Sequence, residues 1–504
     1  MPMTDGLQVM DRDTAGERGK FGYVCGALGA TLLEVWDDAL GSRDPIGFPG
    51  YVRVLAGLGG RAAVASGLVE FDGSALAALE FDFDVLGGSM GAVEGEKIVR
   101  AFDRARVRRL PILAIVRTGG ARMQEGMASL VQMARTTDAL VRHAEAGLMS
   151  LALLRSPTTG GVFVSWASLA DLRAVEAGAT IGFGGPRVVE QATGRLPHGS
   201  HNADSARRHG LVDAVVEDSD HARRWVCAAL GLTNSPLQLP RDRPLVPAAT
   251  SAQPRRRERS AMQVVETARQ ATRPSGLEWA AALTTSWTEI AGAGCGVRSG
   301  LATLGRTRVV VIAMDRHATT LKEARLTTAD YKLARRAVDM AGRWGLPLLT
   351  IVDTAGADPS SASENAGIAY EIAALFRAMS AAPVPTMSLC VGEGGSGGAM
   401  AFSHVDAFWM LEDAFYSVIA PEGAATILWR DASRAHEAAG YLALTASRVL
   451  ELGVIDRIVR ISDGAALVAS MIESELQQLQ VGRRASRLDR VTAAAIIDQR
   501  APGP

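Results

Sequence analysis

Short apolar runs recur along the chain, each followed by small residues and then by a longer amphipathic segment. Such runs are typical of buried strands, and amphipathic segments are typical of helices that cover a sheet. The pattern predicts strands at 52–55, 62–71, 75–83, 112–116, 148–154, 308–314, 348–352 and 386–390, and helices at 94–106, 123–146, 331–343 and 365–379. Strand, small-residue turn and helix in repeated order indicate parallel βα units.

Small-residue turns follow four of the predicted strands, two in each half of the chain. They are Gly119-Gly120-Ala121, Thr159-Gly160-Gly161, Thr354-Ala355-Gly356-Ala357 and Gly392 to Ala399. Glycine lets a backbone approach a ligand closely, and a helix start leaves N–H groups free to hold a negative oxygen. One such loop is equally well explained as a tight turn. Several together, without a Ser-His-Asp set or a metal cluster, suggest oxyanion stabilisation by backbone N–H groups.

The strand and helix order of the first half recurs after a proline-rich, basic stretch, so the chain resembles two copies of one architecture. A chain of 504 residues is too long for a single core. We expect a flexible N-terminus at 1–20, a domain at 21–235, a linker at 236–262, a second domain at 263–480 and a tail at 481–504.

The composition is that of a globular protein, with 48% hydrophobic and 21% charged residues and a net charge of −1. A charge this close to zero argues against nucleic acid or an anionic membrane as the main partner. The four cysteines stand far apart, which is typical of reduced thiols in a cytosolic protein and not of a zinc site. Without a signal peptide or a membrane-spanning run, we expect a cytoplasmic location.

Several motifs in matching order resemble a known family. The first half resembles the beta subunit of bacterial acetyl-CoA carboxylase carboxyltransferase, at 87–91, 119–125, 157–162 and 181–191. The second half resembles the alpha subunit of the same enzyme, at 273–274, 353–357, 392–399 and 416–423. The resemblance implies an α/β fold of two crotonase-like (ClpP/crotonase superfamily) domains of repeated ββα units.

The family's reaction moves a carboxyl group from carboxybiotin to the α-carbon of a short acyl-CoA, acetyl-CoA or propionyl-CoA. The chain has neither a Met-Lys-Met biotinylation motif nor a P-loop. Biotin is therefore expected on a separate carrier protein, with biotin carboxylase and biotin carboxyl carrier protein as partners. The family's sites form across subunits, so a homo-oligomer, a dimer or a hexamer, is expected.

The reaction that the resemblance implies needs donors for two oxyanions, and the glycine turns supply candidates. For the acyl-CoA thioester oxygen they are Gly119 or Gly120 together with Gly160 or Gly161. For the ureido oxygen of biotin they are Gly356, Ala357, Gly394 and Gly395. No side-chain base is required if the leaving ureido nitrogen takes the α-proton.

Candidate substrate-binding residues come from the same motifs: Arg122, Gly88, Gly184, Arg187, Tyr416 and Glu422. Guanidinium groups pair well with the phosphates of CoA, and Arg122 is the stronger of the two arginine candidates. For Tyr416 and Glu422, lining a pocket and packing in the core both remain open. Glu125 and Glu393 are interpreted as residues that lock the loops.

The chain departs from the family at several places. The four-cysteine zinc ribbon of the bacterial beta subunit is missing, so no metal and no zinc are expected. Thr118, Ala355 and Asp358 stand where the family has Ser, Pro and Tyr. Two alternatives therefore stay open: a decarboxylase of malonyl-type thioesters, and a non-catalytic assembly subunit.

Overall fold

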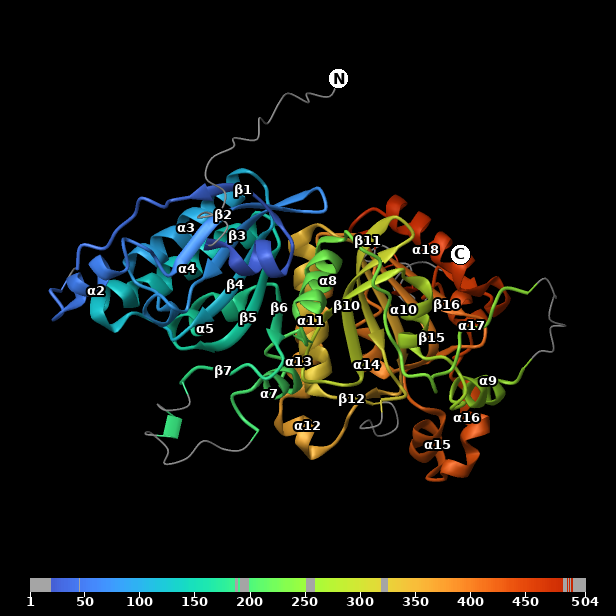
Figure 1. The fold of residues 1–504 in the computed structure, drawn as a ribbon. Helices are drawn as coiled ribbons and strands as arrows, with labels where there is room; N and C mark the ends of the chain where they lie inside the picture. The colour runs from blue at the N-terminus through green and yellow to red at the C-terminus, as the bar shows by residue number, and fades with distance from the viewer. Residues whose placement is uncertain are drawn as a thin grey trace, which may run out of the picture. The chain divides into compact units, whose positions relative to one another are not determined.

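The computed structural model describes residues 20–44, 46–185, 189–190, 199–250, 259–318, 325–483, 487, 489 and 491–492. The chain divides into two compact units, Met1–Thr233 (the first unit) and Asn234–Pro504 (the second unit). Each unit is built around a sheet of its own (Figure 1).

The described part of the first unit forms an eight-stranded sheet in the order β1-β2-β3-β4-β5-β6-β8, with β7 paired to β5. Its strands are β1 (Thr31–Trp36), β2 (Val64–Phe71), β3 (Ser74–Phe81), β4 (Ile112–Thr118), β5 (Ser150–Thr159), β6 (Leu172–Glu176), β7 (Ile181–Gly182) and β8 (Ala214–Val216). The first three strands pair antiparallel, and from β3 to β8 the pairing is parallel.

Helices follow the strands of the first unit, as the apolar pattern predicts. They are α2 (Tyr51–Gly57), α3 (Ala92–Val107), α4 (Met127–Glu145), α5 (Gly161–Ser165), α7 (Ala203–Arg208) and α8 (Ser219–Leu230). Helices α3 and α4 pack against each other, and α3 also packs on β2 and β3 (Figure 1).

The second unit has the same strand order, β9-β10-β11-β13-β15-β16-β18, with β17 paired to β15 and a separate pair of β12 and β14. Its strands are β9 (Ser286–Ile290), β10 (Val297–Leu304), β11 (Thr307–Met314), β12 (Arg325–Leu326), β13 (Leu348–Thr354), β14 (Gly356–Ala357), β15 (Thr386–Gly395), β16 (Ala407–Leu411), β17 (Phe415–Ser417) and β18 (Arg457–Val459). Pairing is antiparallel from β9 to β11 and parallel beyond it, so the predicted duplication of one architecture is confirmed.

The helices of the second unit occupy matching places in that order. They are α9 (Ala261–Ala268), α10 (Gly276–Leu283), α11 (Thr328–Trp344), α12 (Ser361–Asn365), α13 (Ile368–Ala381), α14 (Ser396–Met400), α15 (Pro421–Trp429), α16 (Ala435–Tyr441), α17 (Ala446–Glu451) and α18 (Gly464–Gln478). Helix α11 packs on β10, β11 and α13, and α10 packs on β11, β13 and β15.

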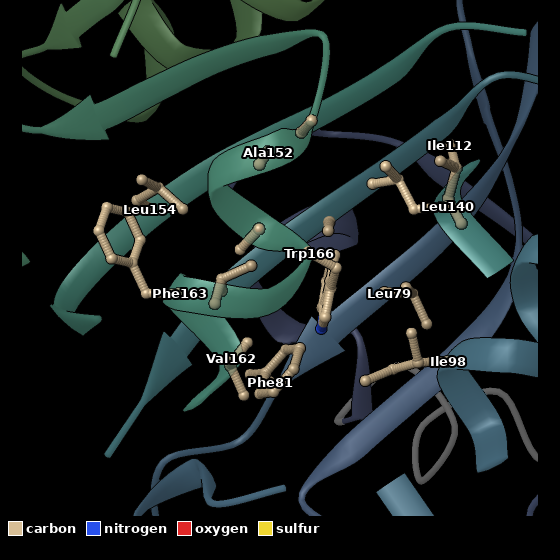
Figure 2. Packing of buried hydrophobic residues seen from close by; sticks show 14 of the residues in the cluster. Leu79, Phe81, Ile98, Ile112, Leu140, Ala152, Leu154, Val162, Phe163 and Trp166 are labelled. Carbon is tan, nitrogen blue, oxygen red and sulfur yellow. The ribbon is translucent and has the colours of Figure 1, made fainter. Parts of the chain in front are cut away.

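The core of the first unit forms around Trp166, which follows the short helix α5. Its ring stacks on Phe81 with 6.2 Å between ring centroids, and Phe102 meets it edge-on at 5.9 Å. Figure 2 shows Trp166 pointing to the side where Phe81 and Leu79 lie. These rings belong to β3, to α3 and to the residue that follows α5, so their packing holds the C-terminal end of α5 against β3 and α3.

Two predicted boundaries are wrong. Residues Val52–Leu55 belong to helix α2 and not to a strand. Val52 and Val54 are exposed there, so their β-branched side chains are not packed on a sheet, and nothing favours strand pairing. The turn predicted at Gly392 starts later, because β15 continues to Gly395 before α14 begins.

Trp166→Ala should lower the free energy of unfolding of the first unit by ~3–5 kcal/mol, because it removes a fully buried ring and leaves a cavity. Urea denaturation of the purified chain, followed by circular dichroism, measures this change. Leu169→Ala, at a side chain that is 53% exposed, is the matched control and should change stability by less than ~1 kcal/mol. Similar small shifts in both variants would contradict the packing described here.

Candidate functional site

Three of the N–H groups predicted to bind substrate oxygen hold the glycine turns in shape instead. Gly119 N donates to a backbone carbonyl of the preceding turn at 2.9 Å, and Gly120 N donates to the Thr118 hydroxyl at 3.0 Å. At the end of β5, Gly160 N donates to the Phe183 carbonyl at 3.0 Å. The prediction for these three groups is corrected, because each donor already has an acceptor.

The N–H groups of Ala121 and Gly161 lie beside these turns and point elsewhere. Met90 N donates to the Gly120 carbonyl at 2.8 Å and Arg122 N donates to the Met90 carbonyl at 2.9 Å, so the Ala121 N–H between them faces away from Met90. Gly161 is the first residue of α5, where an N–H has no acceptor within the helix. A Cβ built on Gly161 would lie 3.3 Å from the Ala121 nitrogen. The two donors can therefore serve one oxyanion.

The second unit repeats this arrangement. Gly356 N donates to the Thr354 hydroxyl at 3.0 Å, and its φ of +113° matches the +111° found at the same place in the first unit. Asp358 N donates to the Leu326 carbonyl at 2.8 Å, so the Ala357 N–H faces away from Leu326. Ala357 therefore holds the place of the alanine donor in the first unit, and Gly356 does not offer its N–H.

The second donor of this pair is Gly397, which the sequence did not single out. Gly394 and Gly395 lie inside β15 and pair with β13 and β17, and a Cβ on Gly395 would lie 2.3 Å from the Ala355 carbonyl oxygen. Their backbone serves the sheet and close packing, which corrects the prediction that they bind biotin. Gly397 lies in the first turn of α14, where N–H groups have no helical acceptor. A Cβ on the next residue, Gly398, would lie 2.7 Å from the Ala357 nitrogen, so Ala357 and Gly397 are the candidate second pair.

Two departures from the family have local structural explanations. The Thr118 hydroxyl accepts from the turn as Thr354 does in the second unit, so threonine keeps the hydroxyl that fixes the turn. Asp358 accepts from Ser360 N at 3.1 Å and from the Ser360 and Ser363 hydroxyls at 2.6 Å, at the start of α12. Its hydrogen bonds with the two serines hold the pKa of Asp358 below its ordinary value.

Arg122 is only 2% exposed, and its guanidinium group is used inside the first unit. It pairs with Glu94 at 2.8 Å and donates to the Tyr51 hydroxyl at 3.2 Å and to the Ser89 carbonyl at 2.6 Å. Burial alone would lower the pKa of Arg122, but Glu94 and Tyr51 hold it above its ordinary value. Tyr51 donates in turn to Glu125 at 2.6 Å. Arg122 therefore fixes the turn, and Glu125 locks it as expected. The predicted contact of Arg122 with a CoA phosphate stays a prediction.

The glycine candidates of the first unit serve close packing. Gly88 has a φ of +62°, and a Cβ there would lie 2.1 Å from the Arg117 carbonyl oxygen. A Cβ on Gly184 would lie 3.0 Å from a methyl group of Val189. Arg187 lies outside the described residues, so its candidate role stays a prediction.

Tyr416 and Glu422 have different surroundings. Tyr416 is 7% exposed, donates to the Ser403 hydroxyl at 3.2 Å and packs in the core, which is one of the two roles left open for it. Glu422 is partly exposed and accepts from Arg269 at 2.9 Å. Arg269 also donates to Glu393 at 2.6 and 3.0 Å. This bidentate bond confirms the interpretation that Glu393 locks its loop.

A buried ionic cluster lies under the glycine turn of the second unit. Arg316 pairs with Asp353 at 3.1 Å and with Glu393 at 3.5 Å, and Glu393 N donates to Asp353 at 3.0 Å. Burial raises the pKa of Asp353, and the Arg316 charge opposes that shift. The cluster ties the end of β13 to the glycine segment of β15.

Among the described residues, no group of three His, Cys, Asp or Glu side chains could hold a metal ion. Zinc content stays a prediction that elemental analysis can test. Over the same residues, every helix is too short or too polar to cross a membrane.

The fold and the site define a two-unit α/β protein that can hold oxyanions with backbone N–H groups. A family model described as "Acetyl co-enzyme A carboxylase carboxyltransferase-like" matches residues 250–502. The acetyl-coenzyme A carboxylase carboxyl transferase subunits beta/alpha of Salinispora tropica are 39% identical over 440 residues, covering 82% of this chain and 77% of the relative. The corresponding subunits of Saccharopolyspora erythraea are 38% identical over 463 residues, which cover 88% of this chain and 79% of the relative. The chain belongs to this carboxyltransferase family, as the sequence motifs implied, and it is an enzyme of that class.

Solved structures agree on the fold. Transcarboxylase 12S with hydrolyzed methylmalonyl-coenzyme A bound gives a TM-score of 0.73 at 21% identity, over 90% of this chain and 88% of that one. A single-chain, multi-domain long-chain acyl-CoA carboxylase gives a TM-score of 0.66 at 19% identity, over 82% of this chain and 41% of that one. The predicted crotonase-like fold is confirmed.

Arg122→Ala should lower the free energy of unfolding by ~3–5 kcal/mol, because it leaves Glu94 and Glu125 buried without their cation. The control is Arg135→Ala, which removes an exposed pair with Glu96 and should cost less than ~1 kcal/mol. Urea denaturation of the two variants compares these changes. Equal small costs would mean that Arg122 does not fix the turn.

Proposed function

We propose that this chain moves the carboxyl group from N1 of carboxybiotin to the α-carbon of a short acyl-CoA, acetyl-CoA or propionyl-CoA. The duplicated donor pair carries the proposal. The N–H groups of Ala121 and Gly161 form one oxyanion hole, called the first hole, and those of Ala357 and Gly397 form an equivalent second hole. The family's reaction develops negative charge on two different oxygens, and each of the two holes would stabilise one of these charges. A simple thioester decarboxylase would need only one.

In this proposal the first unit binds the thioester oxygen and the second unit binds the ureido oxygen. Loss of the α-proton places negative charge on the thioester oxygen, and loss of the carboxyl group from N1 places it on the ureido oxygen. Two N–H donors fixed in a dry site stabilise each charge without rearranging. The N1–carboxyl bond breaks, a carbon–carbon bond forms at the α-carbon, and the α-proton moves to N1, so no side-chain base is required.

A cavity in the first unit, lined in part by Arg122, is the candidate substrate pocket. Its volume is about 460 Å³, and its lining includes Arg43, Arg61 and Val52. Arg43 and Arg61 are both exposed, and Arg61 pairs with Asp82. Arginine side chains suit phosphate groups, so Arg43 is our candidate contact for CoA. Neither Arg43 nor Arg61 lies in a glycine motif, which is why sequence reasoning missed them.

Other chains complete the system. A biotin carboxylase and a biotin carboxyl carrier protein would supply carboxybiotin, and a homo-oligomer of this chain would carry the sites. We propose residues 21–235 and 263–480 as the beta-like and alpha-like domains, joined by 236–262. None of the four cysteines forms a disulfide with another, which fits a reducing cytoplasm.

Carboxyl loss from malonyl-CoA or methylmalonyl-CoA should depend on biotin, because the ureido nitrogen must accept the carboxyl group. The test incubates the purified chain with each thioester, with and without free biotin, and follows the decarboxylated CoA product by chromatography. We expect turnover with biotin and only background without it. The same rate in both would establish the decarboxylase instead, and no turnover with either would favour the assembly subunit.

Gly161→Pro should reduce carboxyl transfer by roughly 100- to 1000-fold, because it removes one oxyanion donor. Proline suits the first position of a helix, so α5 can keep its start. Gly161→Ala adds the same Cβ, which would lie 3.1 Å from the Met133 sulfur, but keeps the N–H. The ratio of kcat between these two variants isolates the donor. A ratio near one would show that the Gly161 N–H does not bind the oxyanion.

A further inference from the structure

The hydroxyl group of Tyr331 is buried and has no hydrogen-bond partner in the described part of the chain. Tyr331 lies in the first turn of α11, and its side chain is fully buried. An unpaired hydroxyl in a protein interior costs free energy, so its presence calls for a reason. The structural roles of the ring do not require it, because phenylalanine would fill the same space.

This hydroxyl lies close to the donor peptides of the second unit. A Cβ built on Gly398 would lie 2.7 Å from the Tyr331 oxygen and 2.7 Å from the Ala357 nitrogen. Gly398 comes directly after Gly397, the second donor of that hole. The Tyr331 ring is held in place by Phe402, with 5.5 Å between ring centroids. The missing side chain at Gly398 therefore lets the phenol approach the donor peptide.

In the described part of the first unit, the residue that corresponds to Tyr331 carries no hydroxyl. In both helices the third residue accepts a hydrogen bond from the N-cap N–H: Glu94 of α3 from Gly91 at 3.0 Å, and Asp330 of α11 from Thr327 at 2.8 Å. Glu94 therefore corresponds to Asp330, and Gly95 stands where Tyr331 stands. A residue with positive φ also stands at the start of each short helix: Gly160 at +70° for α5 and Ser396 at +62° for α14. Val162 and Gly398 each come two residues later, so Val162 stands where Gly398 stands. An apolar side chain therefore stands beside the first hole, and a phenol beside the second.

We propose that the Tyr331 hydroxyl supplies a dipole that stabilises the oxyanion held by Ala357 and Gly397, and so distinguishes the second hole from the first. This inference rests on the proposed function, in which that oxyanion is the ureido oxygen of biotin. A hydroxyl without a partner can rotate its hydrogen toward a charge that develops nearby. In a buried site such a dipole acts over a longer distance than in water, even without direct contact.

The protonation state of the phenol suits this role. Burial, with the neighbouring Asp330 carboxylate, raises the pKa of Tyr331 above its ordinary value. The group therefore stays a neutral donor throughout the range in which the enzyme can be assayed. Its contribution should show no pH dependence of its own between pH 6 and pH 9.

Tyr331→Phe removes the hydroxyl and keeps the ring. We expect kcat of biotin-dependent carboxyl loss from malonyl-CoA to fall about 10-fold, less than for a direct donor because the hydroxyl lies close to the donor peptides without being one of the donors. KM for malonyl-CoA should not change, because that thioester is assigned to the first unit. The urea midpoint should stay the same or rise, because an unpaired polar group is removed.

Thr288→Val is the matched control, since it deletes another buried hydroxyl without a described partner, in strand β9 of the same unit. It should leave kcat unchanged. Three results would overturn the inference. They are a wild-type kcat in Tyr331→Phe, an equal loss of kcat in both variants, and a Tyr331→Phe chain that does not fold. Failure of the proposed function would appear earlier, as wild-type activity that is absent or independent of biotin.

Discussion

The site depends on how closely two backbone turns approach each other. A Cβ on Gly120 would lie 3.1 Å from the Gly160 Cα, and a Cβ on Gly160 would lie 3.0 Å from the Gly120 Cα. In the second unit, a Cβ on Gly356 would lie 2.9 Å from the Gly395 carbonyl oxygen. Only glycine permits this contact, and at Gly120, Gly160 and Gly356 the positive φ adds a second reason. The approach brings the end of one strand against the start of the next helix, where the free N–H groups are.

The two units keep this geometry with different residues. A threonine hydroxyl fixes the turn in each unit. The ion pairs around the turn differ: the first unit uses Arg122 with its carboxylates, and the second uses Arg316 with Asp353 and Glu393. The buried arginines hold their turns through ion pairs and hydrogen bonds inside their own units, and Arg122 also lines the cavity of the first unit. The strand order and the donor pair are thus the shared part of the fold, and the ionic supports are where the two units have diverged.

The sequence predicted the parallel strands well, because strands covered on both faces, such as β4 and β13, appear as continuous apolar runs. It predicted the glycine turns and two of the four donors, Gly161 and Ala357, but it placed the other two one to three residues away. Which N–H is free depends on pairing between distant segments, such as Met90 with Ala121, and no local pattern shows this. The partners of Arg122 and the burial of Tyr416 were hidden for the same reason. The strand predicted at Val52 was wrong because a β-branched run forms a strand only where a neighbouring strand is present to pair with it.

The central claim is that two equivalent pairs of backbone N–H groups hold the two reacting oxygens. A crystal structure of the protein with biotin and a short acyl-CoA bound tests it most directly. The account predicts the ureido oxygen within about 2.7–3.1 Å of the Ala357 and Gly397 nitrogens, and the thioester oxygen at the same distance from those of Ala121 and Gly161. Either oxygen bound to side chains, or placed away from both pairs, would contradict it.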